Sequence, residues 1–181
     1  MNKTIAVIGS SRRNGNTGKL IDLIAQAINI EVIDLDLKNI SAFDYQHKNS
    51  NDDFLPLMDH LLKHDNIIFA SPVYWFAMSA QMKIFIDRMS DFLSVERLKD
   101  KGRMLRGKVG YVVATSISES IDDSFIDSFT DTFKYLGMGY GGVVHLDCVR
   151  GFSAQNSDIE LANFIKKLNP DKAEVKTLQM T

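Results

Sequence analysis

The sequence predicts an α/β fold in which a five-stranded parallel sheet has helices on both faces. Short apolar runs rich in β-branched residues alternate along the chain with stretches whose apolar residues repeat at helical spacing. Strands that alternate with helices are joined by right-handed crossovers, so the strands run parallel and the helices cover both faces. No internal repeat or linker interrupts this pattern, and 181 residues is an ordinary length for one domain. We therefore expect a single domain over residues 1–181.

The expected elements begin with a strand at 4–8, where the run TIAVI is apolar enough to be buried on both faces. A helix that begins near Asn16 places its apolar residues on one stripe: Leu20, Ile21, Ile24 and Ile28. Apolar and acidic residues alternate over 30–37, which predicts the second strand. A polar loop is expected over about 38–51 and a helix over about 53–64.

The middle of the chain contains the third strand, at 66–70, which ends at Ser71-Pro72. The helix that follows carries methionine and phenylalanine at helical spacing: Met78, Met82, Phe85, Met89 and Phe92. Such a stripe is typical of packing, either against the sheet or against a partner subunit. Mixed charges and glycines over 94–107 predict a loop with some helical turn.

The last third of the chain begins with the fourth strand, at 109–115. Ser120, with Asp123 three residues later, resembles a capping box that opens a helix. That helix carries an apolar stripe: Ile121, Phe125, Phe129 and Phe133. A fifth strand at 140–146 and a last helix at 157–168 complete the pattern, and a frayed tail is expected after them.

The composition narrows the classes of partner. The formal net charge of -2 and the pI of about 6.1 favour neither nucleic acid nor an anionic membrane as a partner. No apolar run approaches the roughly 18 residues that a membrane helix needs, and the first residues lack the apolar core of a secretion signal. One cysteine, Cys148, allows no intrachain disulfide and no cysteine-ligated iron–sulfur cluster. We therefore expect a soluble, cytoplasmic protein.

A candidate site follows from the topology. In open parallel sheets, ligands lie beyond the carboxyl ends of the strands, where the strand order reverses. The loops after the first, third and fourth predicted strands all open at that edge, and they begin at Gly9, Ser71 and Ser116. We expect a ligand to lie where these three loops meet.

The first loop, GSSRRNGNT over 9–17, has the composition of an anion-binding loop. It is not a P-loop, because five residues separate Gly9 from Gly15 and the lysine that follows a P-loop is absent. It is not a dinucleotide loop either, because residue 11 is serine where the second glycine would stand. Short donors precede and open a helix: Ser10, Asn14, Asn16 and Thr17. With Arg12 or Arg13 as a forked contact, the loop suits one phosphate monoester; the alternative is a surface turn that caps the helix and has solvated arginines.

The second loop favours the functional interpretation. Three consecutive aromatic residues, Tyr74, Trp75 and Phe76, stand at the mouth of the sheet immediately before a helix. Exposed aromatic residues in a row suit a core poorly, but they make a good wall for a flat ring.

The two motifs, GSSRRNGNT after the first strand and SPVYWFAMSAQMKIFIDRM after the third, resemble the NADPH-dependent FMN reductase family. The resemblance spans the layout of the whole chain. It implies a flavodoxin-like three-layer sandwich whose sheet has the order 2-1-3-4-5. It also implies FMN as cofactor, NADPH or NADH as co-substrate, and a homodimer or higher homo-oligomer.

The resemblance also implies which residues contact FMN. The phosphate would be held by Ser10, Arg12, Asn16 and Thr17, with Asn14 as an addition, whereas Arg13 is expected to face solvent. The isoalloxazine would be lined by Pro72, Val73, Tyr74 and Trp75, and its edge contacted by Thr115 and Ser116. Many relatives are glycine-rich after the fourth strand, but this chain reads ATSISES over 114–120, which predicts a narrower space above the ring.

The predicted function is an FMN-dependent NAD(P)H oxidoreductase that passes electrons to a small acceptor such as a quinone or a flavin. Because the cofactor performs the chemistry, no catalytic side chain is expected. One alternative is a flavodoxin-like electron carrier that binds FMN without turning over nicotinamide, although such carriers are more acidic than this chain. Another is a structural or regulatory protein that has kept the fold and lost the flavin.

Two histidine patterns are weaker. His60 and His64 are four residues apart on a predicted helix and could share a metal, but no third ligand is evident, so a surface helix is favoured. His145 and Cys148 are three positions apart, and if the fifth strand continues through both, this odd spacing places them on opposite faces and argues against a reactive pair. We expect no metal site.

Overall fold

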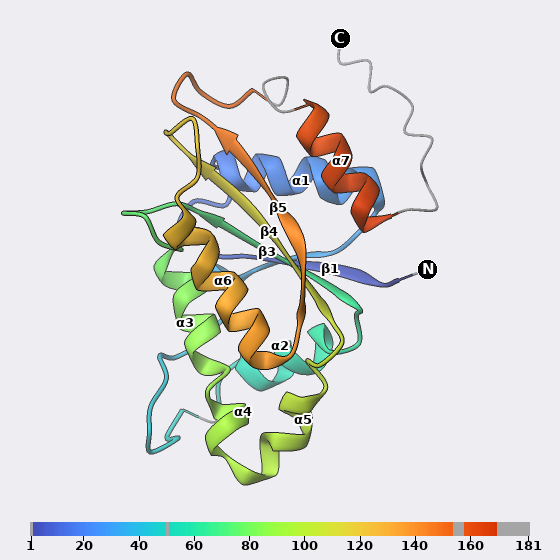
Figure 1. Ribbon diagram of the computed structural model, residues 1–181. Coiled ribbons are helices and arrows are strands. Elements are labelled where there is room, and N and C mark those ends of the chain that lie inside the picture. Colours follow the sequence, from blue (N-terminus) through green and yellow to red (C-terminus); the bar gives the residue numbers. More distant parts are fainter. Residues whose placement is uncertain (1, 50, 154–157, 170–181) are drawn as a thin grey trace.

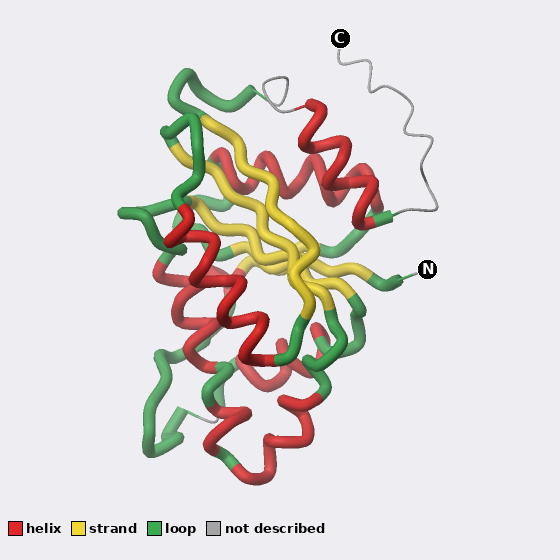
Figure 2. Tube along the Cα trace, viewed as in Figure 1, coloured by secondary structure: helices red, strands yellow, loops and turns green. Residues whose placement is uncertain are grey.

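The computed structural model describes residues 2–49, 51–153 and 158–169. Its five parallel strands form one twisted sheet in the order β2-β1-β3-β4-β5, which confirms the predicted fold class and strand order (Figure 2). The strands are β1 (Thr4–Ile8), β2 (Val32–Asp34), β3 (Asn66–Pro72), β4 (Val109–Ser116) and β5 (Gly139–Asp147). The strands β1, β3 and β4 are apolar and rich in β-branched residues because helices cover both of their faces.

Helices cover both faces of the sheet (Figure 1). On one face lie α1 (Asn16–Ile28) and α7 (Asp158–Leu168), which pack leucine and isoleucine side chains against the strands. On the other face lie α2 (Phe54–Leu61), α3 (Ala80–Arg88) and α6 (Asp123–Leu136), whose core is rich in phenylalanine. This three-layer arrangement leaves the loops at the carboxyl ends of the strands free to form a site.

The methionine and phenylalanine stripe after β3 packs against the sheet. All five of its side chains are buried in the phenylalanine-rich core. The stripe is therefore not available to a partner subunit. The helix that carries it ends at Arg88 and is followed by shorter helical segments: α4 (Asp91–Ser94), η2 (Glu96–Leu98) and α5 (Lys99–Arg103). Residues 94–107 thus contain more helix than the predicted loop with some helical turn.

Two local predictions are wrong. The second strand ends at Asp34 instead of continuing to residue 37, because the Asp34 carboxylate accepts the Asp36 N–H at 3.0 Å and turns the chain into the short helix η1 (Leu35–Leu37). The expected capping box does not form either. The helix α6 begins only at Asp123, without a side-chain cap, so Ile121 precedes it.

The structure places the two weaker histidine patterns in different surroundings. His60 Nε2 lies 2.8 Å from a Glu31 carboxylate oxygen, and the described ranges contain no cluster of three or more metal-binding side chains. Cys148 is buried in the core on the α1 and α7 face of the sheet. His145 is the β5 partner of Ala114, whose side chain belongs to the core on the other face, so the two residues lie on opposite faces. Burial raises the pKa of the Cys148 thiol, so it is a poor nucleophile.

Within the described part of the chain, no helix has the length and apolarity needed to cross a bilayer. Ser157 and the expected tail lie outside the described residues.

Candidate functional site

Hydrogen bonds join the three loops at the carboxyl ends of β1, β3 and β4 into one assembly. The Gly9 N–H donates to the Ala70 carbonyl at 2.9 Å, which joins the first loop to β3. The Val73 N–H donates to the Thr115 carbonyl at 2.9 Å, which joins the second loop to the third. The hydroxyl oxygens of Thr17 and Thr115 lie 2.7 Å apart and are buried. The predicted meeting of the three loops is therefore present.

Two serines that the sequence pattern does not mark as site residues, Ser71 and Ser79, stabilise this assembly. Both are fully buried. Ser79 Oγ donates to the Gly9 carbonyl at 2.6 Å and accepts the Met82 N–H, which caps α3. Ser71 Oγ accepts the Ser79 N–H at 2.9 Å and donates to the carbonyl of Pro72. A serine directly before a helical pattern predicts a cap, but the bond to Gly9 spans 70 residues and leaves no local signal.

The first loop presents unpaired amides at the start of α1. Gly15 precedes the helix without a side-chain cap, and the N–H groups of Asn16, Thr17 and Gly18 have no hydrogen-bond partner among the residues described. A Cβ at Gly18 would lie 1.7 Å from the Arg13 carbonyl oxygen, so only glycine allows this close turn. Free amides together with the positive end of a 13-residue helix form a site for an anion.

Ser10 and Thr17 lie inside this loop, and Asn14 lies on its surface. Ser10 Oγ accepts the Arg12 N–H at 3.3 Å, so the buried hydroxyl stabilises the turn that carries Arg12. Asn16 is partly exposed at the helix start. The structure thus brings together all five residues predicted to hold the phosphate.

The two arginines of the loop differ. Arg13 is half-buried and pairs with both carboxylate oxygens of Asp22, at 3.0 and 2.5 Å, which raises the pKa of its guanidinium. The expectation that Arg13 faces solvent is therefore wrong, because α1 turns Asp22 toward it. Arg12 is exposed and has no ion pair with any residue in the described ranges. Arg12 is thus the arginine that is free to bind an anion.

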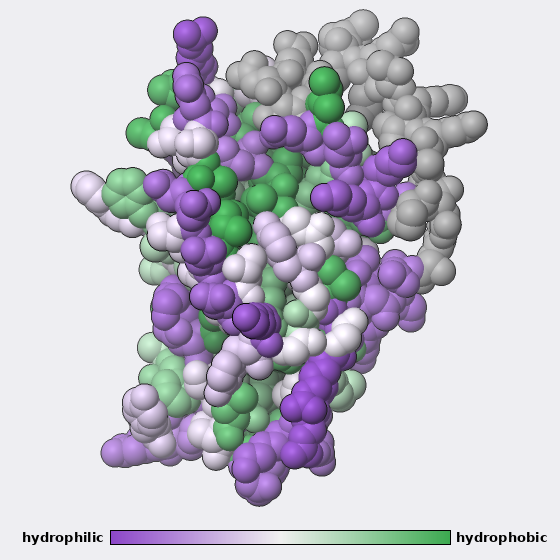
Figure 3. Space-filling model, viewed as in Figure 1, coloured by the Kyte–Doolittle hydropathy of each residue, from purple (hydrophilic) through white to green (hydrophobic). Residues whose placement is uncertain are grey.

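The aromatic loop is a tight turn that projects from the sheet edge, at the left of Figure 1. Tyr74 and Ala77 exchange two backbone hydrogen bonds, at 2.9 and 3.0 Å. The two residues between them have left-handed backbones, with φ of 49° at Trp75 and 63° at Phe76. These two residues are 93% and 63% exposed, and in Figure 3 the projection carries green, hydrophobic atoms beside pale purple ones. Bulky residues rarely adopt this conformation, and such strain is concentrated at functional sites.

A cavity of about 530 Å³ lies between the aromatic turn and the third loop. It is lined by residues 73–76, 116–118 and 120–122, which include Val73, Tyr74, Trp75 and Ser116 of the predicted set. Pro72 and Thr115 do not line it; both are buried and form the last pair between β3 and β4. The cavity therefore has an aromatic wall on one side and serine-rich backbone on the other, which suits a flat polar ring.

The strand order, with an anion-receptive loop after β1 and an aromatic loop after β3, defines the flavodoxin-like class, in which FMN lies at the point where strand order reverses. The residues fit that nucleotide, because free amides and Arg12 suit its phosphate and the aromatic-walled cavity suits its ring. The family model of NADPH-dependent FMN reductases matches residues 2–144, and the chain belongs to this family.

Individual relatives agree with this assignment. The chain is 36% identical over 117 residues to YwqN of Bacillus subtilis, which is named as an NAD(P)H-dependent FMN-containing oxidoreductase. That match covers 61% of this chain and 65% of YwqN, just under two thirds of its length. Among solved structures, the Trp repressor binding protein of Bacillus subtilis has a TM-score of 0.72 at 26% identity, covering 94% of this chain and 100% of that one. An FMN-dependent NADH-azoreductase of Bacillus anthracis, solved in complex with FMN, shares the fold with a TM-score of 0.67 at 15% identity, covering 93% and 99%.

Proposed function

We propose that the chain is an FMN-dependent NAD(P)H oxidoreductase that takes electrons from NADPH or NADH and passes them to a small acceptor such as a quinone, a flavin or a similar electrophile. One observation carries the proposal: an anion-receptive loop and an aromatic-walled cavity are hydrogen-bonded into one assembly at the carboxyl edge of the sheet. Membership of the family and the likeness to YwqN support the same activity.

The first loop would hold the FMN phosphate. The free N–H groups of Asn16, Thr17 and Gly18 can donate to phosphate oxygens, and Arg12 adds a charge-assisted contact. Ser10 holds the turn that carries Arg12. The phosphate would thus be recognised by its charge as well as by its shape.

The aromatic turn and the third loop would enclose the ring. When bound, FMN supplies the two-electron chemistry, and the chain supplies position and access. Tyr74 and Trp75 offer aromatic surface to the ring and to a nicotinamide that approaches it, because both line the cavity and are exposed. The chemistry requires no side-chain acid or base, so we assign no catalytic residue.

An anaerobic titration of the FMN-loaded protein with NADH and with NADPH tests this proposal. Bleaching of the flavin by either nucleotide, followed by reoxidation with a quinone or free flavin, is the expected result. A flavin that neither nucleotide reduces would favour the electron carrier. A protein that binds no FMN would overturn both flavin functions.

We further propose that the protein is a homodimer in the cytoplasm, where reduced nicotinamide is available. The exposed aromatic turn supports an interface near the cavity, since Trp75 and Phe76 present apolar surface to solvent. Light scattering after gel filtration tests it: a dimer mass is expected, and a monomer mass at micromolar concentration would contradict it.

A further inference from the structure

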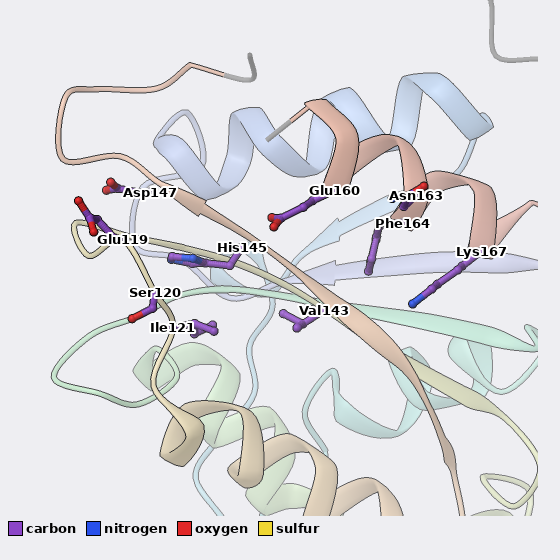
Figure 4. A pocket seen from close by; sticks show the side chains of 10 residues that line it. All are labelled: Glu119, Ser120, Ile121, Val143, His145, Asp147, Glu160, Asn163, Phe164 and Lys167. Atoms are coloured by element: carbon purple, nitrogen blue, oxygen red, sulfur yellow. The ribbon is translucent and has the colours of Figure 1, made fainter. Parts of the chain in front are cut away.

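A second cavity, of about 740 Å³, lies behind the third loop along the outer edge of β5 (Figure 4). Its walls are residues 119–121, the β5 residues Val143, His145 and Asp147, and one side of α7. Ser120 and Ile121 line this cavity and also the aromatic-walled one. The third loop is therefore a thin wall between the two cavities, and whatever fixes its conformation shapes the proposed ring site.

His145 contacts this wall at its first residue. Its Nε2 lies 2.7 Å from Ser116 Oγ, across from β5 to the end of β4. Ser116 Oγ also accepts the Ser118 N–H at 3.1 Å and lies 3.2 Å from the Ser118 carbonyl. The Cys148 N–H donates to the Ser116 carbonyl at 2.8 Å, so β5 and the residue directly after it contact both the side chain and the backbone of Ser116. The serine hydroxyl is thus the centre of the turn, and His145 is its one side-chain partner among the described residues.

The hydrogen bond can form in either protonation state of the imidazole. A neutral ring with its proton on Nδ1 accepts a hydrogen bond from the Ser116 hydroxyl at Nε2. A charged ring donates from Nε2 to Ser116 Oγ, and the Ser116 hydroxyl then donates to the Ser118 carbonyl. The groups around His145 are Asp147 on its own strand, Glu119 and Ser120 on the loop, and Glu160, Asn163 and Lys167 on α7. Burial lowers the pKa of His145, although Asp147 and Glu160 act in the opposite direction.

We propose that His145 is a positioning residue for the ring site: its hydrogen bond to Ser116 sets the conformation of residues 116–122 and thereby the affinity for FMN. This inference rests on the proposed FMN function. His145 need not touch the flavin, because it lies in the second cavity and acts through Ser116, which lines the first.

The test measures FMN affinity through quenching of Trp75, the one tryptophan of the chain, in five proteins. These are the unmodified chain, His145→Ala, His145→Gln, Ser116→Ala and the double variant His145→Ala/Ser116→Ala. We expect His145→Ala to weaken FMN binding about 3- to 10-fold, the range that one neutral hydrogen bond supports. We expect His145→Gln to restore most of the affinity and the double variant to be no weaker than either single variant. Asn163→Ala, which alters the same cavity without contacting Ser116, is the matched control and should bind FMN normally.

Hydrogen exchange of the same proteins without FMN tests the role of His145 in ordering the third loop separately from its effect on FMN affinity. The Ser118 amide should exchange faster in His145→Ala than in Asn163→Ala, because the former loses the bond that orders Ser116. If the unmodified chain binds no FMN, the proposed function fails while the exchange data still judge the role of His145 in the loop. Unchanged affinity in His145→Ala, or losses that simply add in the double variant, would overturn the proposal.

Discussion

Two arginines, Arg12 in the first loop and Arg88 at the end of α3, show how a binding group differs from a structural one. Arg88 is fully buried, pairs with Asp52 and with Asp91, and lies 4.7 Å from the centre of the Phe54 ring. Arg12 is exposed and has no carboxylate partner in the described ranges. The same guanidinium chemistry therefore stabilises the fold where its partners belong to the chain, and is free to bind an anion where they do not.

The Arg88 cluster ties the long loop before α2 to the end of α3. Burial alone would raise the pKa of Asp52, but hydrogen bonds from Arg88 and from the N–H groups of Ser41 and Phe54 outweigh it and lower that pKa. Arg88 also donates to the Ser41 carbonyl at 3.2 Å. Its charge and donors are thus used within the fold, and we assign it no binding role.

Removal of the Arg88 side chain should give the largest effect. Arg88→Met leaves two buried carboxylates without their cation, so we expect the free energy of unfolding to fall by about 3–5 kcal/mol. Urea unfolding measures this loss. Arg103→Met, which breaks an exposed pair with Asp100, is the matched control and should cost less than about 1 kcal/mol. Equal losses in the two variants would contradict a structural role for the buried cluster.

Removal of Arg12 should act on binding instead of stability. Arg12→Ala should weaken FMN affinity by about 1.5–3 kcal/mol, the range for hydrogen bonds to a charged group, and leave urea unfolding unchanged. Arg13→Ala is the matched control, because Arg13 is already paired with Asp22 and should affect FMN much less. Equal losses of affinity in isothermal titration would show that the wrong arginine has been assigned to the phosphate.

Relief of backbone strain in the aromatic turn should raise the stability of the protein and lower its affinity for FMN. Replacing Trp75 by Asn and Phe76 by Gly supplies residues that adopt left-handed backbones readily, so thermal or urea unfolding should show a gain of about 1–2 kcal/mol. The same double variant keeps only Tyr74 of the three aromatic residues in the wall, and its FMN affinity should fall. A variant that gains stability and keeps full FMN affinity would remove the turn from the site.

The smallest expected effect is a pH dependence from His145. Burial lowers its pKa below the ordinary value of 6.5, so the unfolded chain takes up a proton before the folded chain does. Its contribution to stability is therefore complete above 6.5 and is lost as the pH falls toward the folded pKa. Urea unfolding at about pH 7.5 and pH 5.5 should show a smaller decrease for His145→Gln than for the unmodified chain. An identical decrease in the two proteins would show that His145 titrates alike in both states.

Prediction from sequence succeeded where the signal was local. The β-branched runs and the apolar stripe of α1 directly reflect burial, and the loop compositions marked the sheet edge where the candidate site is proposed. It failed where the decisive contact joins distant residues. The bonds Thr17–Thr115, Ser79–Gly9 and Ser116–His145 join residues far apart in the chain, and no spacing rule reports them. The Arg13–Asp22 pair spans nine residues around a loop, which is not a helical spacing, so it too could not be predicted.

A comparison of FMN with riboflavin, which lacks the phosphate, tests the central claim most directly. Quenching of Trp75 reports both affinities, in the unmodified chain and in Arg12→Ala. If the first loop holds the phosphate, the unmodified chain should bind FMN about 10- to 100-fold more tightly than riboflavin, and Arg12→Ala should lose most of that difference. Equal affinity for the two flavins in the unmodified chain, or a preference for FMN that Arg12→Ala leaves intact, would contradict the account.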